Sequence, residues 1–371
     1  MKIALVVTGG LHPSGTAQVI PALLWLVERL ARVHTVHAFS LRHLPRPATY
    51  SLLGATVHDL GRPRGRWPQW RALRRAMDAH GPFDVVHGYW VAPAGLMAAL
   101  VGRRLSVPSV VTCDSGEFVA LPEIDYGLQR SLNGRAQVSL ACRAATRVHV
   151  ASEYMQRLAR GMGVSALCVP FGVDLARVRP PAQRFEGPPW RLLQVASLNR
   201  VKDQSTLLRA VAFARRTLDV HLDLVGEDTL DGQLAREASA LGVAEWVTFH
   251  GFQPQADLAR LRDRAHLYVQ SSRHEAAGLA VLEAAAAGLP VVGTRFGFVS
   301  DWADHAALAV APGDAAALAG SILSLIAHPA RRHELARAAR AFAEQHDADA
   351  TARRMTDLYA DLARTRRTSR T

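Results

Sequence analysis

The stretch Ser272-Arg-His-Glu-Ala-Ala-Gly-Leu-Ala-Val-Leu-Glu-Ala-Ala-Ala-Ala-Gly-Leu-Pro-Val-Val292 decides the fold predicted for this chain. An apolar run at 265–269 precedes it, an alanine-rich segment at 279–287 stops at Gly288, and a second apolar run begins at Leu289. This succession is typical of a strand, a loop, a short helix and another strand. It therefore predicts an α/β fold built on a parallel sheet.

Two glutamates in this stretch indicate the kind of ligand. Glu275 is expected in the loop at the carboxyl end of a strand, and Glu283 about one turn into the following helix. Open α/β sheets bind ligands at that edge, and helix N-termini there attract phosphates. Carboxylates beside an anion site are suited to sugar hydroxyls, because each can accept two hydrogen bonds from a vicinal diol. The ligand predicted from these residues is a nucleotide sugar.

The same alternation of strands and helices extends through both halves of the chain, which predicts two doubly wound domains facing a cleft. We expect an N-terminal Rossmann-like domain at 1–175, a second at 190–345 after a proline-rich linker, and a last helix, about 348–371, that returns to the first domain. The expected strands are 2–7, 35–39, 55–60, 84–89, 109–113, 146–151, 191–197, 221–225, 247–249, 266–270, 289–293 and 307–310. The expected helices are 17–32, 71–80, 92–104, 129–145, 204–216, 232–241, 257–263, 315–326, 329–344 and 348–364.

Composition limits the class of protein. The chain has 371 residues, a formal charge of +12 and 49% hydrophobic residues, which suits a two-domain globular protein with anionic partners. Three scattered cysteines fit buried thiols in a reducing compartment better than a disulfide framework. Because no leader peptide or membrane-spanning run is recognisable, we expect a cytoplasmic protein.

A second candidate site follows the strand expected at 191–197. Arg200 and Lys202 lie in the turn before a helix that begins near Gln204. Two cations beside a helix N-terminus would form a diphosphate clamp. Solvated loop cations are the alternative.

Two loops of the first half are candidate acceptor sites. Gly15, Thr16 and His12 lie in a glycine-rich loop that lacks the dinucleotide-binding spacing, and Asp114 and Glu117 follow the strand at 109–113. A surface histidine and an ordinary capped loop explain the same residues equally well.

No metal site is predicted. Asp347-Ala-Asp349 lies between two expected helices, where capping explains it, and the 16 histidines show no paired ligand spacing.

Together these residues resemble the family 4 retaining glycosyltransferases, which share the GT-B fold. Glu275 and Glu283 are similar to the family's E-x7-E element, and Lys202 to the lysine that grips the donor diphosphate. The segment at 168–174 resembles the crossing before the second domain. Ser197 stands where the family often has arginine, so Arg200 would supply the second cation.

The resemblance implies a role for each candidate residue. Glu275, Lys202 and Arg200 would act in catalysis, without a metal or another cofactor. The donor would be a UDP-, GDP- or ADP-sugar. The residues implied to bind it are Glu283, Gly278, Leu279, Ala280, Ser197, Gly226, Phe252 and Gln253.

The acceptor implied is a glycan, a lipid or a small molecule. The arginine- and tryptophan-rich stretch at 62–75 could also touch an anionic membrane, although a solvated basic helix explains it as well. No specific nucleic acid is expected. The competing functions are a nucleotide-sugar epimerase or hydrolase, and a non-catalytic protein that binds polyanions.

Overall fold

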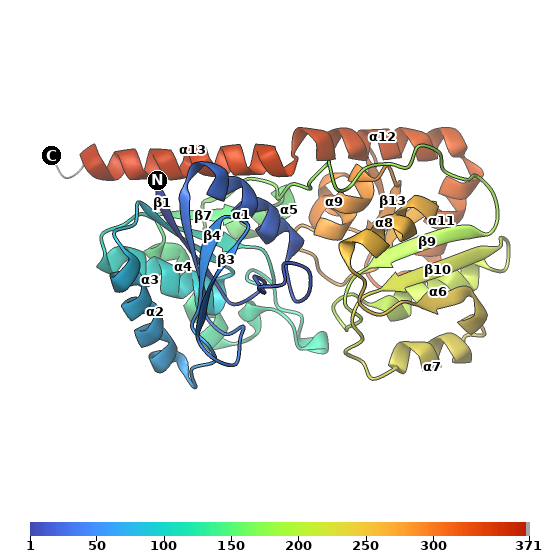
Figure 1. Ribbon diagram of the computed structural model, residues 1–371. Helices are drawn as coiled ribbons and strands as arrows, with labels where there is room; N and C mark the ends of the chain where they lie inside the picture. Colours follow the sequence, from blue (N-terminus) through green and yellow to red (C-terminus); the bar gives the residue numbers. More distant parts are fainter. Residues whose placement is uncertain (369–371) are drawn as a thin grey trace. The chain divides into compact units, whose positions relative to one another are not determined.

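The computed structural model describes residues 1–368, which form two compact units. Unit 1 comprises Met1–Gly172 together with the C-terminal segment from Ala348, and unit 2 comprises Val173–Asp347. Each unit has one sheet with helices on both faces, so the predicted α/β class is confirmed (Figure 1). No helix within residues 1–368 is both long and apolar enough to cross a bilayer.

The sheet of unit 1 has the strand order β3-β4-β2-β1-β5-β6-β7-β8. Every neighbouring pair is parallel except β3 and β4. Its central strands are buried on both faces, as a parallel sheet covered by helices requires. The strands are β1 (Lys2–Val7), β2 (Thr35–Ser40), β3 (Ala48–Leu52), β4 (Ala55–Asp59), β5 (Val85–Tyr89), β6 (Ser109–Cys113), β7 (Arg147–Val150) and β8 (Ala166–Cys168).

The antiparallel strand β3 was not predicted. It joins β4 through a two-residue turn in which Leu53 and Gly54 both have positive φ, 52° and 84°. Such a turn fits the twist of a hairpin, but leucine in the left-handed region is not a recognisable turn signal. The hairpin is therefore hidden in the sequence.

Helices cover both faces of the unit 1 sheet. Helices α2 and α3 pack on the face that carries Val6, Phe39 and Val86, while α1 contacts α13, which also contacts β5 (Figure 1). The helices are α1 (Pro21–Val33), α2 (Arg66–His80), α3 (Leu96–Arg104), α4 (Leu132–Ala144), α5 (Glu153–Gly161) and α13 (Ala348–Thr368), with short turns η1 (Val91–Gly95), η2 (Pro122–Ile124) and η3 (Leu128–Arg130).

Helix α1 begins at Pro21, four residues later than expected. Proline favours the first helical position, where its missing N–H has no partner to lose. The residues before it form a loop closed by a Leu11–Val19 bridge and by the Ile20 amide, which donates to the Gly10 carbonyl at 3.1 Å. This loop directly follows β1.

The sheet of unit 2 is entirely parallel and has the order β11-β10-β9-β12-β13-β14. In chain order this is 3-2-1-4-5-6, the arrangement of a dinucleotide-binding sheet. The connections change direction between β9 and β12, and such a point leaves a crevice beyond the carboxyl ends of the strands. The strands are β9 (Trp190–Val195), β10 (Val220–Val225), β11 (Val247–Phe249), β12 (Leu267–Gln270), β13 (Val291–Thr294) and β14 (Ala307–Val310).

The main core of unit 2 lies between its sheet and helices α6, α7 and α11. Leu207, Leu234 and Ile322 contribute one buried side chain from each of these helices. Helices α8 and α9 contact the strands as well, and α12 contacts α9, β13 and β14. The helices are α6 (Gln204–Ala214), α7 (Gln233–Ala240), α8 (Gln255–Arg264), α9 (Leu279–Ala286), α10 (Gly297–Asp301), α11 (Ala315–Ala327) and α12 (Pro329–Gln345), with a turn η4 (Ala244–Trp246).

A buried hydrogen-bond chain ties α13 to the sheet of unit 1. The Tyr359 hydroxyl lies 2.6 Å from His87 Nδ1, His87 Nε2 lies 2.7 Å from the Thr112 hydroxyl, and that hydroxyl lies 2.8 Å from His149 Nδ1. His149 Nε2 donates to the Val169 carbonyl at 2.9 Å. With Val169 as the terminal acceptor and both histidines neutral, each link has one donor, and the Tyr359 hydroxyl donates to His87 Nδ1. Burial lowers the pKa of His87, and it lowers the pKa of His149 to about 4, which agrees with neutral rings.

We predict that Tyr359→Phe destabilises unit 1 by roughly 1–3 kcal/mol, because it leaves the buried His87 Nδ1 without a donor. Urea unfolding measures the change. Tyr50→Phe is the control, since its half-buried hydroxyl donates to the Leu11 carbonyl near the surface and its loss should cost less. Equal midpoints for Tyr359→Phe and the unaltered chain would contradict the role assigned to this hydrogen bond.

Candidate functional site

The crevice predicted by the strand order of unit 2 is bordered by the loops that follow β9 and β12. Lys202 lies in the loop between β9 and α6, and Glu275 in the loop between β12 and α9. These residues are 73 positions apart in the sequence, yet Lys202 Nζ lies 2.6 Å from Glu275 Oε1. The structure thus brings two of the predicted catalytic residues together at the switch point, the place between β9 and β12 where the strand connections change direction.

The ion pair is partly accessible and only partly satisfied. The side chains of Lys202 and Glu275 are 25% and 14% exposed. The Ser272 hydroxyl donates to the same oxygen, Glu275 Oε1, at 2.6 Å. An ammonium has three N–H donors and a carboxylate about four acceptor positions. Both groups therefore retain capacity for a ligand.

Backbone and side-chain hydrogen bonds fix the loop that carries Lys202. Asn199 Oδ1 accepts from the amides of Val201 and Lys202 at 3.0 and 3.1 Å. Asp203 then caps α6 by accepting from the Thr206 amide. Across the crevice, the Ser271 hydroxyl donates to the Lys202 carbonyl at 2.9 Å. The ammonium is thus carried by a loop whose backbone is held on both sides.

Glu283 lies in a different environment from Glu275. Its Oε2 accepts from Arg262 Nη1 at 2.9 Å, and its Oε1 lies 3.5 Å from Gln255 Nε2. The Glu283 and Arg262 side chains are only 7% and 4% exposed. Burial raises the pKa of Glu283, and the Arg262 guanidinium opposes that shift. The carboxylate expected to bind ribose is therefore already half satisfied by the protein.

The Tyr268 hydroxyl is influenced electrostatically by both glutamates. Burial raises the pKa of its hydroxyl, and the negative charges of Glu275 and Glu283 raise it further. The hydroxyl lies 3.3 Å from the Val195 carbonyl at the end of β9. Both carboxylates are thus close enough to Tyr268, on β12, to influence it electrostatically.

Helix α9 presents an uncapped N-terminus in the same loop. Its N-cap is Gly278, with φ of 85°, and no side chain accepts from the first-turn amides. A Cβ at Gly297 would lie 2.3 Å from the Ala277 carbonyl oxygen, so only glycine allows the start of α10 to pack there. The Phe298 amide donates to that carbonyl at 2.8 Å. This packing orients the N-terminus of α9.

The other expected donor residues lie at the same edge without contacting the ion pair. Ser197 and Arg200 are exposed, and among residues 1–368 Arg200 has no hydrogen-bond or ion-pair partner. Gly226 follows β10 and lets the backbone pass so close that a Cβ would lie 2.0 Å from the Ala196 oxygen. Phe252 is 58% exposed, and Gln253 donates to the His250 carbonyl at 2.7 Å.

The acceptor candidates of unit 1 lie in the loops after β1, which borders the switch between β1 and β5, and after β6, the next strand beyond β5. His12 Nδ1 lies 2.9 Å from the Ser14 hydroxyl, and the Gly15 amide donates to the His12 carbonyl, so this loop folds on itself. Thr16 is exposed and Asp114 is half-buried.

The Glu117 side chain is buried and is not accessible to a ligand. It is 1% exposed, and its carboxylate accepts from the amides of Ser115 and Val91 at 2.7 and 3.4 Å. Burial raises its pKa, which these hydrogen bonds oppose. Its expected place at the acceptor surface is therefore wrong, because the side chain turns inward to satisfy backbone donors.

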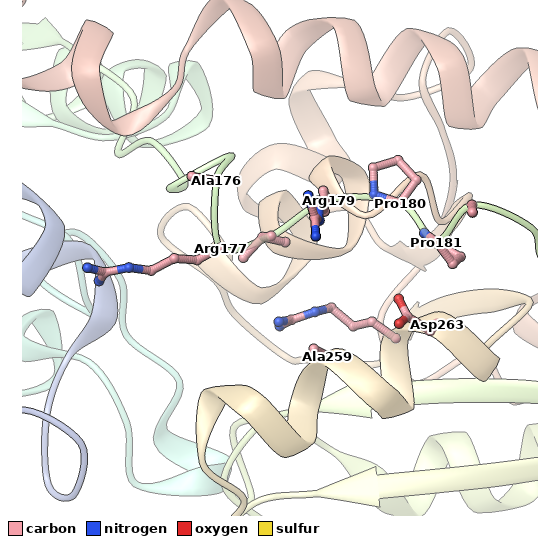
Figure 2. A pocket seen from close by; sticks show the side chains of 10 residues that line it. Ala176, Arg177, Arg179, Pro180, Pro181, Ala259 and Asp263 are labelled. Atoms are coloured by element: carbon pink, nitrogen blue, oxygen red, sulfur yellow. The ribbon is translucent and has the colours of Figure 1, made fainter.

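A separate hollow of about 580 Å³ lies between residues 176–182 and α8. Figure 2 shows Pro180 and Pro181 above Asp263, while the Arg177 side chain extends away from Asp263. None of the expected donor residues lines this hollow. Its connection to the site is Arg262, which lines it and also pairs with Glu283.

Several residues that shape the site were not predicted: Arg262, Gln255, Ser272, Ser271, Gly297 and Tyr268. Arg262 and Gln255 lie on α8, and nothing in their spacing indicates that they face Glu283 on α9. Ser272 was predictable in principle, since it lies three residues before Glu275 in the same loop.

Family models match both units. The model "Glycosyl transferases group 1" matches residues 179–342, and the model "Glycosyl transferase 4-like domain" matches residues 19–172. The chain is 31% identical over 324 residues to the D-inositol 3-phosphate glycosyltransferase of Acidothermus cellulolyticus, covering 80% of this chain and 71% of that protein. It is 29% identical over 333 residues to the protein of the same name from Arthrobacter sp., covering 83% and 75%.

Solved structures share the fold. Sucrose-phosphate synthase from Thermosynechococcus elongatus aligns with a TM-score of 0.82 at 21% identity, covering 98% of this chain and 99% of that one. Anabaena Alr3699/HepE in complex with UDP-glucose aligns with a TM-score of 0.75 at 19% identity, covering 97% and 100%. The GT-B fold expected from the sequence is thereby confirmed. Because family models match both units and the Acidothermus relative is 31% identical over 71% of its length, this chain belongs to the group 1 glycosyl transferases.

Proposed function

We propose that this protein is a retaining glycosyltransferase that moves a sugar from a nucleotide-diphosphate sugar, bound at the carboxyl edge of unit 2, to an acceptor. The observation that carries the proposal is the Lys202–Glu275 pair at the switch point, next to the open N-terminus of α9. One loop region thus offers positive charge, which attracts phosphates. It also offers carboxylate oxygens, which accept hydrogen bonds from sugar hydroxyls.

The leaving diphosphate gains negative charge as the glycosidic bond breaks. Lys202 would donate to it with the N–H groups that Glu275 does not use, together with the first-turn amides of Gly278, Leu279 and Ala280. Arg200, exposed in the same loop as Lys202, would supply a second cation. Donors placed where charge develops lower the transition state more than the ground state.

The carboxylates would orient the donor. Glu275 Oε2 has no hydrogen-bond partner among residues 1–368, and we propose that it accepts from hydroxyls of the transferred sugar. Glu283 would accept from the ribose hydroxyls with the lone pairs that Arg262 and Gln255 leave free. Arg262 would then fix the Glu283 carboxylate.

Ser197, Gly226, Phe252 and Gln253 complete the proposed donor site, with Phe252 and Gln253 near the nucleotide base. The ammonium of Lys202 and the helix N-terminus together supply the charge that a divalent cation would otherwise provide, so we propose that transfer needs no metal. The loops of unit 1 that carry His12, Gly15, Thr16 and Asp114 would receive the acceptor.

A donor panel tests the proposed function. We expect one of UDP-, GDP- or ADP-glucose to raise the melting temperature, because binding to the folded state stabilises it by mass action. HepE, with UDP-glucose bound in its structure, makes the UDP-sugar the first choice, and the names of the relatives make D-inositol 3-phosphate the first acceptor. Glu283→Ala should abolish the shift.

The product distinguishes the possible reactions. Transfer with the donor's anomeric configuration kept, in excess chelator, is the expected result. Free sugar released equally with and without acceptor would identify a hydrolase. If no nucleotide sugar shifted the melting temperature, the proposed donor site would be incorrect.

Replacing the ammonium should slow the chemical step. We predict that Lys202→Ala lowers kcat by roughly 30- to 1,000-fold, the effect of removing about 2–4 kcal/mol of transition-state stabilisation. Lys202→Met, which keeps most of the side-chain length, should be similarly impaired if charge is the cause. Turnover kept within a factor of three in both variants would reject the diphosphate clamp.

The basic surface of α2 is a proposed site of contact with anionic membranes. Trp67 is 68% exposed, and Arg71, Arg74 and Arg75 are exposed on the same helix. Trp67→Ser should reduce pelleting with phosphatidylserine vesicles at low salt at least about fivefold. Phe185→Ser, at a side chain that is 69% exposed in unit 2, is the matched control. Equal pelleting of both variants would argue against this surface.

A further inference from the structure

Three histidines from separate elements of unit 1 meet on the face of the sheet that α2 covers. His37 lies on β2, His58 on the neighbouring strand β4, and His80 is the last residue of α2. The register pairs Phe39 with His58, so His37 and His58 project from the same face, offset by two residues. The fold therefore assembles a cluster that no spacing in the sequence reveals.

The cluster has the dimensions of a metal site. One ring nitrogen from each histidine lies within 4.8 Å of the other two. His37 Nδ1 and His58 Nε2 are 2.9 Å apart. Three imidazoles on a tetrahedral zinc ion, with Zn–N bonds of about 2.0–2.1 Å, place their nitrogens roughly 3.4 Å apart. Metal binding would require the stacked His58 and His80 rings to rotate so that the three nitrogens point toward one ion.

The surroundings prepare the rings as ligands. Thr49 Oγ1 lies 3.4 Å from His58 Nδ1 and can accept a hydrogen bond from a protonated Nδ1, the tautomer that leaves the lone pair on Nε2, the atom that faces His37. Burial lowers the pKa of His58 to about 4 and also lowers the pKa of His37. Neutral imidazole is the form that binds metals, and burial of both rings favours that form.

Charges near the cluster act in opposite directions. His80 ends a 15-residue helix, and the partial negative charge of a helix C-terminus favours a cation. The positive charge of Lys2 helps to lower the pKa of His37 and would disfavour binding of a cation. Its Nζ lies 5.4 Å from the Phe83 ring centroid. Phe39 stacks on His58 with ring centroids 5.0 Å apart, which shields one side of the cluster from water.

We propose that His37, His58 and His80 bind a divalent transition metal, with zinc as the physiological occupant and a fourth position open to water. Imidazole ligands suit zinc, and three protein ligands with an open position form a recognised zinc geometry. The site would clamp β2, β4 and the end of α2 together. His80 closes α2 just before β5 begins, and none of the three histidines belongs to the loops that follow β1 and β6. The clamp is thus separate from the loops proposed to bind the acceptor.

The competing explanation is a metal-free cluster held by stacking and hydrogen bonds. The His58 and His80 rings are stacked with centroids 4.1 Å apart, and His37 and His58 are close enough for one hydrogen bond. Such a cluster would gain nothing from zinc. The two explanations therefore differ in stoichiometric zinc binding, which needs no measurement of transfer activity.

The test uses the full chain without an affinity tag, stripped with a chelator and titrated with zinc chloride by calorimetry. We expect one zinc per chain, a melting temperature that rises with zinc and falls with chelator, and intense visible absorption when cobalt replaces zinc. His80→Gln, at a half-buried helix end, should weaken zinc binding roughly 100-fold or more. His333→Gln, at an exposed histidine of unit 2, should leave zinc binding unchanged.

Absence of stoichiometric zinc binding to the unaltered chain would overturn the proposal, and so would equal affinity in His80→Gln and His333→Gln. If His58→Gln failed to fold, the cobalt spectrum of the unaltered chain and the His80→Gln titration would still decide the question. Because the donor residues all lie in unit 2, failure here would leave the proposed transferase function intact, and the reverse also holds.

Discussion

The parting of strands β9 and β12 is the feature on which the proposed site depends. These strands pair over only two residue pairs, Leu192 with Leu267 and Leu193 with Tyr268, and then diverge. Beyond that point, Gln194 Nε2 donates to the Ser271 hydroxyl at 3.0 Å, and that hydroxyl donates to the Lys202 carbonyl. Side-chain hydrogen bonds thus replace the backbone hydrogen bonds where β9 and β12 no longer pair. They position the loop that carries Lys202.

The two glutamates of this region illustrate how one fold assigns different tasks to the same residue type. Glu275 keeps an accessible oxygen and shares a flexible ammonium, so a ligand can join it without breaking the pair. Glu283 is buried against a guanidinium, and removing Arg262 would leave an uncompensated charge in the interior. The first arrangement suits a group that meets changing charge during a reaction. The second suits a fixed binding contact whose geometry is set before the ligand arrives.

The sequence predicted most of the framework because alternation and strand ends are local properties. Strands at Lys2–Val7, Ser109–Cys113, Val247–Phe249 and Ala307–Val310 have the expected bounds. Lys202 and Glu275 could be expected at the same edge, since each directly follows a strand of a parallel sheet. Their ion pair could not, because it depends on β9 and β12 being neighbours although α6, β10, α7, β11 and α8 intervene.

The failures of prediction have a common cause in tertiary packing. Glu117 follows a strand like the other candidates, but its loop folds back so that backbone amides take its carboxylate. The hairpin of β3 turns through Leu53, whose conformation is set by its neighbours rather than by its own preference. The cluster of His37, His58 and His80 exists only because two strands and a helix end converge. None of these features has a signature within a short stretch of sequence.

Composition adds a separate argument about the cation at the switch point. Of the 44 basic residues only Lys2 and Lys202 are lysines, so arginine is the default cation of this chain. A lysine within that background indicates a site where guanidinium is unsuitable. The ammonium is a compact charge whose three donors can be directed separately, toward Glu275 and toward a phosphate at once. A planar guanidinium would fit the carboxylate in a two-pronged pair and hold both Glu275 oxygens. The free oxygen that the proposed sugar contact requires would then be lost, so the proposed contact is compatible with a compact ammonium and not with a guanidinium.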